Sequence, residues 1–99
     1  PDTAAREADF AVLLPDGGLE PLYSAGAVLL CRRERTLPRQ GYALFLLNGA
    51  PLLRRLYRRN GASKLVAPNV DFKAIPVGDG DCLEYIGTIT GQAKNFRWE

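Results

Sequence analysis

The sequence predicts a single, mainly β domain of short strands and hairpins, with at most one short helical turn. Short apolar runs recur about every ten residues, a spacing typical of small barrels and sandwiches. Two Asn-Gly pairs, at 48–49 and 60–61, favour type I′ hairpins because both central residues of such a turn need a positive φ. A chain of 99 residues can bury a sizeable core as one domain, but not as two.

The first three strands are expected at 10–14, 27–33 and 42–47. The run FAVLL at 10–14 is short and ends at Pro15, Asp16 and two glycines, which favours a buried strand over a helix. Residues 19–26 can form one or two helical turns at most, because Gly26 ends them. AVLLCRR at 27–33 and YALFLL at 42–47 are rich in strand-forming residues, and the break at 38–41 separates them.

The segment 51–59 is ambiguous, because its large apolar residues fall at helical spacing and Gly61 could end a helix. Three further strands are expected at 63–67, 74–77 and 82–90. The strand at 74–77 is predicted to lie at an edge, since Pro76 cannot donate a ladder hydrogen bond.

Composition excludes several classes of function. With 46% hydrophobic and 24% charged residues the chain is expected to fold, and a formal charge of +2 is too small for a dedicated nucleic-acid binder. The apolar runs are far shorter than the ~20 residues of a membrane span. We expect a cytoplasmic protein without membrane contact. Because the sequence contains no methionine, we expect it to begin within a longer polypeptide, with 1–8 as the end of a linker and 9–99 as the domain.

The two cysteines, Cys31 and Cys82, are far apart in sequence, and the chain has neither a CxxC motif nor a histidine. They are expected to be free thiols in a reducing compartment. No metal site, cofactor or small-molecule ligand is predicted.

Six blocks of residues carry a resemblance to a known family. In chain order they are DGGLEP at 16–21, GAVLLC at 26–31, RQGYALFLL at 39–47, LRRL at 53–56, LVAPN at 65–69 followed by IPV at 75–77, and IGTITG at 86–91. Their order and spacing resemble the C-terminal domain of LexA-like and phage CI-like repressors, the S24 peptidase family, whose fold is related to the core of signal peptidases. The resemblance implies that 51–59 is a strand, against its own periodicity.

The family's chemistry is self-cleavage by a Ser–Lys dyad, in which a neutral lysine takes the proton of the serine. The resemblance maps the nucleophile onto Gly18 and the general base onto Arg54, which cannot act as a base near neutral pH. Ala27 occupies the position of the family's "GD" aspartate. No catalytic residue is therefore predicted, and Gly17, Gly18, Leu19 and Arg54 are expected to line a vestigial cleft.

Three other residues could in principle supply a replacement dyad: Ser24, Cys31 and Lys64. We expect Ser24 and Lys64 to be solvated and Cys31 to be a buried structural cysteine. A further hypothesis is that Arg54 forms an ion pair with an acidic residue inside the cleft.

Arginines form two clusters, at 32–39 and at 54–59, and each is expected to divide between the two faces of a strand. Solvated or ion-paired faces are the simpler interpretation, and auxiliary contact with DNA phosphates or an acidic partner is the alternative. In the C-terminal tail, Phe96 and Trp98 are candidates for a dimer interface or for capping the core.

The predicted function is the oligomerisation and regulatory domain of a phage-type or SOS-like transcriptional repressor, without self-cleavage. Its expected partner is a second copy of itself, with DNA bound only through an N-terminal helix-turn-helix domain absent from this sequence. The alternatives are an active S24-type serine peptidase with an unrecognised dyad and a stand-alone pseudopeptidase interaction module.

Overall fold

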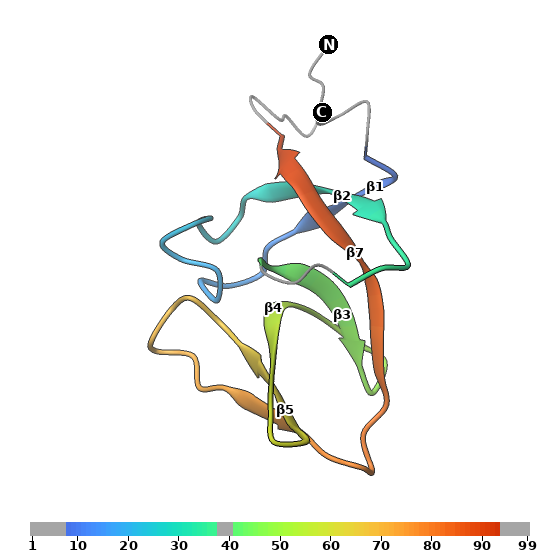
Figure 1. Ribbon diagram of the computed structural model, residues 1–99. Helices are drawn as coiled ribbons and strands as arrows, with labels where there is room; N and C mark the ends of the chain where they lie inside the picture. The colour runs from blue at the N-terminus through green and yellow to red at the C-terminus, as the bar shows by residue number, and fades with distance from the viewer. Residues whose placement is uncertain (1–7, 38–40, 94–99) are drawn as a thin grey trace.

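The structure is a computed structural model that describes residues 8–37 and 41–93. These residues form seven strands and no helix (Figure 1). The strands are β1 (Phe10–Leu13), β2 (Val28–Arg33), β3 (Ala43–Leu47), β4 (Ala50–Arg59), β5 (Ala62–Val66), β6 (Ile75–Val77) and β7 (Leu83–Gln92). The mainly β class is confirmed. Each expected strand is present, with bounds that shift by one or two residues.

All strand pairs are antiparallel, and the order across the curled sheet is β1-β2-β7-β3-β4-β5-β6. The last strand, β7, therefore lies between β2 and β3 and joins the two halves of the sheet (Figure 1). Gly87 lies within this junction, where it pairs with both Arg33 and Leu44 and is buried, and a Cβ added to it would overlap the backbone of β2. Strand β6, which contains Pro76, lies at one edge, as the sequence predicts.

The two Asn-Gly turns have the backbone geometry that the sequence predicts. Asn48 and Asn60 both have a φ of 52°, and the glycines that follow have φ values of 85° and 79°. Positive φ at both central positions is the signature of a type I′ turn, whose twist matches that of the flanking strands. These turns connect β3 to β4 and β4 to β5.

Strand β4 shows why the helical periodicity of 51–59 was misleading. Leu53 belongs to one buried cluster, with Leu14, Leu19, Leu29 and Leu44, whereas Leu52 and Leu56 pack against a second cluster of Ala43, Phe45 and Leu65. Neighbouring residues of a strand point to opposite faces, so a strand covered on both sides has no simple alternation of polar and apolar residues. The strand assignment implied by the family resemblance is correct for this segment.

The segment 19–23 forms a single turn and no regular helix. The N–H groups of Leu22 and Tyr23 both donate to the carbonyl oxygen of Leu19, at 2.9 and 3.1 Å. Gly26 follows with a φ of 87°, and the chain enters β2 directly afterwards. Where the sequence allowed one or two helical turns, the structure thus has one tight turn, which connects the DGGLEP segment to β2.

Candidate functional site: a cleft beside the DGG turn

The DGG turn, residues 16–18, is held in place by hydrogen bonds within the turn and by the buried side chain of the residue that follows it. The Gly18 N–H donates to Oδ1 of Asp16 at 2.9 Å, and the Glu20 N–H donates to the carbonyl oxygen of Gly17 at 3.0 Å. Leu19 is 1% exposed and belongs to the first buried cluster. An Asp side chain that accepts from the backbone two residues later is a common device for fixing such turns. The backbone of Gly18 is therefore set in a defined position.

Arg54, from β4, lies directly against Gly18. An ideal Cβ built on Gly18 would be 3.0 Å from Nη1 and 3.3 Å from Nη2 of Arg54. Gly18 and Arg54 are 36 positions apart in sequence, and the resemblance maps the nucleophile and the base onto them. The fold brings these two positions into contact.

The Arg54 guanidinium is buried and has few polar partners. The side chain is 8% exposed; Nη1 donates to the carbonyl oxygen of Leu53 at 2.9 Å, and Cζ lies 5.6 Å from the centre of the Phe72 ring. Its Nε is buried without a hydrogen-bond partner. Among the residues that the structure describes, no carboxylate forms an ion pair with Arg54. The hypothesis of an ion pair in the cleft is therefore wrong. Asp16, which borders Gly18 as Arg54 does, accepts a hydrogen bond from the Gly18 N–H with its Oδ1 instead.

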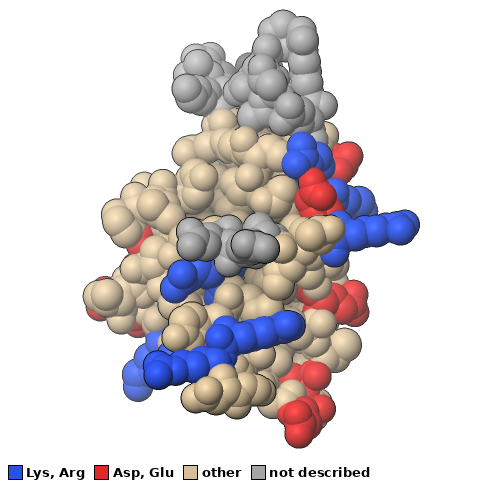
Figure 2. All heavy atoms as spheres, in the orientation of Figure 1, with Lys and Arg blue, Asp and Glu red and all other residues tan. Residues whose placement is uncertain are grey.

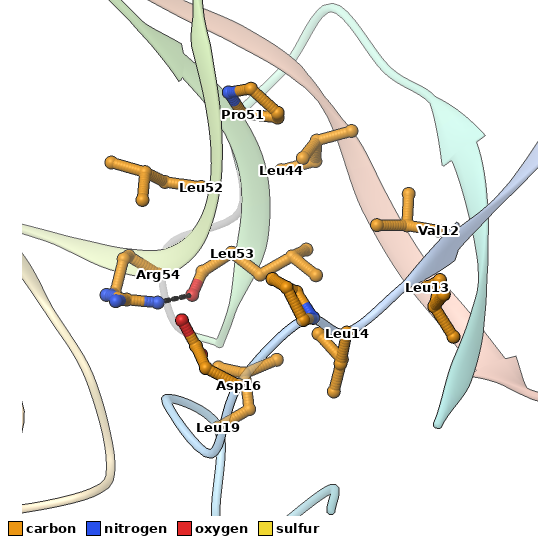
Figure 3. A pocket seen from close by; sticks show the side chains of 11 residues that line it. Val12, Leu13, Leu14, Asp16, Leu19, Leu44, Pro51, Leu52, Leu53 and Arg54 are labelled. Atoms are coloured by element: carbon orange, nitrogen blue, oxygen red, sulfur yellow. Dashed lines mark hydrogen bonds between the residues drawn. The ribbon is translucent and has the colours of Figure 1, made fainter. Parts of the chain in front are cut away.

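A cavity of about 170 Å³ opens beside Arg54 (Figure 3). Its lining is mostly apolar and comes from β1 and the segment after it, the DGG turn, β3 and the first half of β4. The lining residues are Val12, Leu13, Leu14, Pro15, Asp16, Leu19, Leu44, Pro51, Leu52, Leu53 and Arg54. Of the four expected cleft residues, Leu19 and Arg54 line this cavity, and Gly17 and Gly18 lie beside it in the same turn.

Two residues of the site were not identified by sequence reasoning. The Nδ2 of Asn69 donates to the carbonyl oxygen of Gly17 at 2.8 Å, and Phe72 stacks on Arg54. Both belong to the loop after β5, so this loop closes the cleft beyond Arg54. Asn69 lies in the LVAPN block, which was noted as a family signal but not placed in the site.

Of the three candidate replacement residues, Cys31 is buried and the other two are exposed. Cys31 is fully buried, and burial raises its thiol pKa from 9.0 to about 11. Ser24 is exposed after the DGGLEP turn, and Lys64 is exposed on β5, where its Nζ lies 5.2 Å from the centre of the Tyr57 ring. These positions agree with a structural Cys31 and a solvated Ser24 and Lys64. Cys82 is a free, exposed thiol.

The two arginine clusters behave differently from each other. In the first, Arg32 is paired with Glu34, with Nη2 2.7 Å and Nε 2.8 Å from Oε1, and Arg33 lies over the Phe10 ring. In the second, Arg54 is buried and Arg58 and Arg59 are exposed at the far end of β4. On the face that Figure 2 shows, basic side chains are interrupted by acidic and uncharged ones. The ion-paired interpretation thus holds for Arg32.

Some predictions lie outside the described residues or concern other kinds of site. Phe96, Trp98 and Arg39 are not among the described residues, nor is most of the expected linker at 1–8. Within 8–37 and 41–93, no group of three or more His, Cys, Asp or Glu side chains is placed to hold a metal ion. No helix in the same residues is long and apolar enough to cross a membrane.

The curled antiparallel sheet, with a glycine turn and a buried basic side chain meeting at a cleft, defines a small all-β domain. A family model described as Peptidase S24-like matches residues 1–90, and the chain belongs to this family. A comparison with curated proteins gives no match.

Proposed function

We propose that the chain is the oligomerisation and regulatory domain of a phage-type or SOS-like transcriptional repressor, and that it does not cleave itself. The observation that carries the proposal is the contact between Gly18 and Arg54. A glycine offers no hydroxyl for attack on a peptide bond, and an arginine stays protonated near neutral pH and cannot accept a proton. Membership of the S24-like family supports the fold and the position of the cleft.

The proposed regulatory role depends on the association of two copies of the domain and not on peptide-bond cleavage. Two copies of the domain hold two upstream DNA-reading domains near two half-sites, which raises operator affinity through effective concentration. The mixed charges of the described surface support a domain that leaves DNA contact to another part of the protein.

Mass spectrometry of the full natural protein at alkaline pH tests the lack of cleavage. We expect the wild-type chain to stay intact for days, and the double variant Gly18→Ser/Arg54→Lys to acquire slow cleavage because it restores a hydroxyl beside an amine. Self-cleavage by the wild-type protein would show that it is an active peptidase with another dyad. Light scattering on the 99-residue chain tests the pairing, and a strictly monomeric chain at about 100 μM would remove the oligomerisation role.

A second candidate, a stand-alone interaction module, is favoured by one specific observation. The first half of β4 pairs with β3 on one side, whereas β5 pairs only with residues 55–59. The other edge of β4 at 50–54 thus has no strand partner within the described chain, and it borders the cavity. Such an edge can accept an extended segment by strand addition. A helix-turn-helix sequence upstream of residue 1 would favour the repressor over the module.

A further inference from the structure

The cleft contains a buried cation that forms no ion pair with any residue of 8–37 and 41–93. Arg54 is 8% exposed, and its partners are one backbone carbonyl oxygen and one aromatic ring. Its Nε has no hydrogen-bond partner. A buried charge is costly unless it is paired, and buried arginines are usually satisfied by carboxylates or phosphates. The guanidinium is therefore poised to bind an anion that enters the cleft.

Access to this cation depends on Gly18. Any side chain at position 18 would place its Cβ 3.0 Å from Nη1 and 3.3 Å from Nη2, on top of the guanidinium. Asp16 also reaches the cavity, but its Oδ1 accepts a hydrogen bond from the Gly18 N–H. Because Gly18 has no side chain, this space is bordered by the Arg54 guanidinium and by Oδ1 of Asp16, which lies 3.0 Å from the same Cβ position.

The geometry of the cleft indicates which anion fits. Its approach is bordered by two strand edges without strand partners among the described residues: that of β1, which pairs only with β2, and that of β4 at 50–54. The cavity between them has apolar walls and a volume of about 170 Å³, and a cavity of about 150 Å³ is known to admit benzene, so one apolar side chain fits (Figure 3). An extended, apolar peptide segment suits both the edges and the walls.

The cleft is closed at the Arg54 end. Beyond Arg54, β5 occupies the edge of β4, and the loop that follows β5 crosses to the DGG turn through the bond from Asn69 to Gly17. Phe72 of the same loop covers the guanidinium. A peptide that follows the free edge of β4 meets this barrier at Arg54 and has to end there.

We propose that the cleft binds the C-terminal carboxylate of an extended polypeptide segment with an apolar last residue. The carboxylate is held by the Arg54 guanidinium, the last side chain fills the cavity, and the backbone lies along the free edge of β4. The inference rests on the cleft being a binding site rather than a cleaving one, as proposed above.

The test uses two fluorescein-labelled peptides of sequence Gly-Ser-Thr-Val-Ala-Leu, one ending in a free carboxylate and the other in an amide. Fluorescence anisotropy with the wild-type chain is expected to show at least about tenfold tighter binding of the acid, the discrimination typical of one charge-assisted hydrogen-bonded pair. Arg54→Gln is expected to abolish the difference between the two peptides. Arg58→Gln, which removes the same charge from an exposed position of the same strand, is expected to preserve it. Asp16→Asn is expected to strengthen binding of the acid, because a competing anion is removed.

Equal affinity of the wild-type chain for acid and amide, or no binding of either up to 1 mM, would overturn the inference, even if Arg54→Gln does not fold. Mass spectrometry of the peptides after the titration separates the two proposals. Intact peptides with equal affinities contradict only the carboxylate site, whereas cleaved peptides contradict the non-cleaving function as well.

Discussion

Of the described glycines, Gly87 is the one at which an added Cβ should lower the stability of the fold most. A Cβ on this residue would lie 2.9 Å from the carbonyl carbon of Arg32 and 3.2 Å from Cα of Arg33, and closer still to the carbonyl oxygen of Arg32. These are all backbone atoms, so no side-chain rotation can relieve the overlap. Carbon atoms in contact prefer about 3.5–4.0 Å, so β2 would have to withdraw from β7 by roughly 0.5–1 Å.

The cost of Gly87→Ala follows from this displacement. Overpacking of a tightly packed site costs about 1–3 kcal/mol. The withdrawal also stretches the neighbouring ladder hydrogen bonds between β2 and β7, each worth about 1 kcal/mol net. The expected loss is about 3–5 kcal/mol, a large part of the roughly 5–15 kcal/mol that stabilises a domain. In thermal unfolding this corresponds to a Tm lower by about 15 °C or more.

Urea unfolding followed by circular dichroism measures the loss, and Gly80→Ala is the matched control. A Cβ on Gly80 meets no heavy atom within 4 Å, and its φ is not positive, so this variant should stay within about 0.5 kcal/mol of the wild type. If Gly87→Ala also stayed within 1 kcal/mol, the close approach of β2 and β7 would be disproved.

The remaining predictions concern the turns and the cysteines. The Asn48 side chain donates a hydrogen bond to Oδ1 of Asp81 and accepts one from the Cys82 N–H, whereas no such side-chain bond is found for Asn60 in the described chain. Asn48→Gly should therefore lower the free energy of unfolding by about 1–2 kcal/mol more than Asn60→Gly, as measured by urea unfolding. Equal losses for the two variants would contradict the role of these hydrogen bonds. The bond from the Asn48 amide, with a second from a backbone N–H, lowers the pKa of Asp81 below its ordinary 3.8. The stability that the ionised Asp81 carboxylate provides is complete above pH 3.8 and is lost as the pH falls through its lower pKa in the folded protein. In Asn48→Gly, an NMR titration should find the pKa of Asp81 raised toward 3.8. A disulfide reagent at pH 8 should modify the exposed Cys82 in the native protein, but it should modify Cys31 only after unfolding, because burial raises the pKa of the Cys31 thiol to about 11. Rapid reaction of both thiols without denaturant would show that Cys31 is accessible in the folded protein.

Sequence reasoning predicted the strands and hairpins well because their signals are local. An Asn-Gly pair encodes its turn through the φ values of two residues, and a short apolar run bounded by prolines and glycines encodes its strand. The local sequence pattern of 51–59 was misleading because this strand packs on both faces against clusters whose other residues come from distant strands. Only the arrangement of motifs along the whole chain identified it as a strand.

The candidate site was predicted in part for a related reason. Motif spacing placed Gly18 and Arg54 in one cleft, and the structure brings them into contact. Motif spacing could not show that Arg54 forms no ion pair within the described part of the chain, because that depends on the direction in which the Asp16 side chain turns. Nor could it place Phe72 over the guanidinium, since this contact depends on the path of the loop after β5.

The location of β7 has a consequence for how the domain is made in the cell. A ribosome releases the chain from its N-terminus, yet the strand that joins the two halves of the sheet is the last of the seven described strands to be synthesised. Until residue 92 has left the exit tunnel, the edges of β2 and β3 that later pair with β7 have unpaired backbone groups, which can form hydrogen bonds with other nascent chains. A truncation that removes β7 therefore removes the middle of the sheet rather than its border.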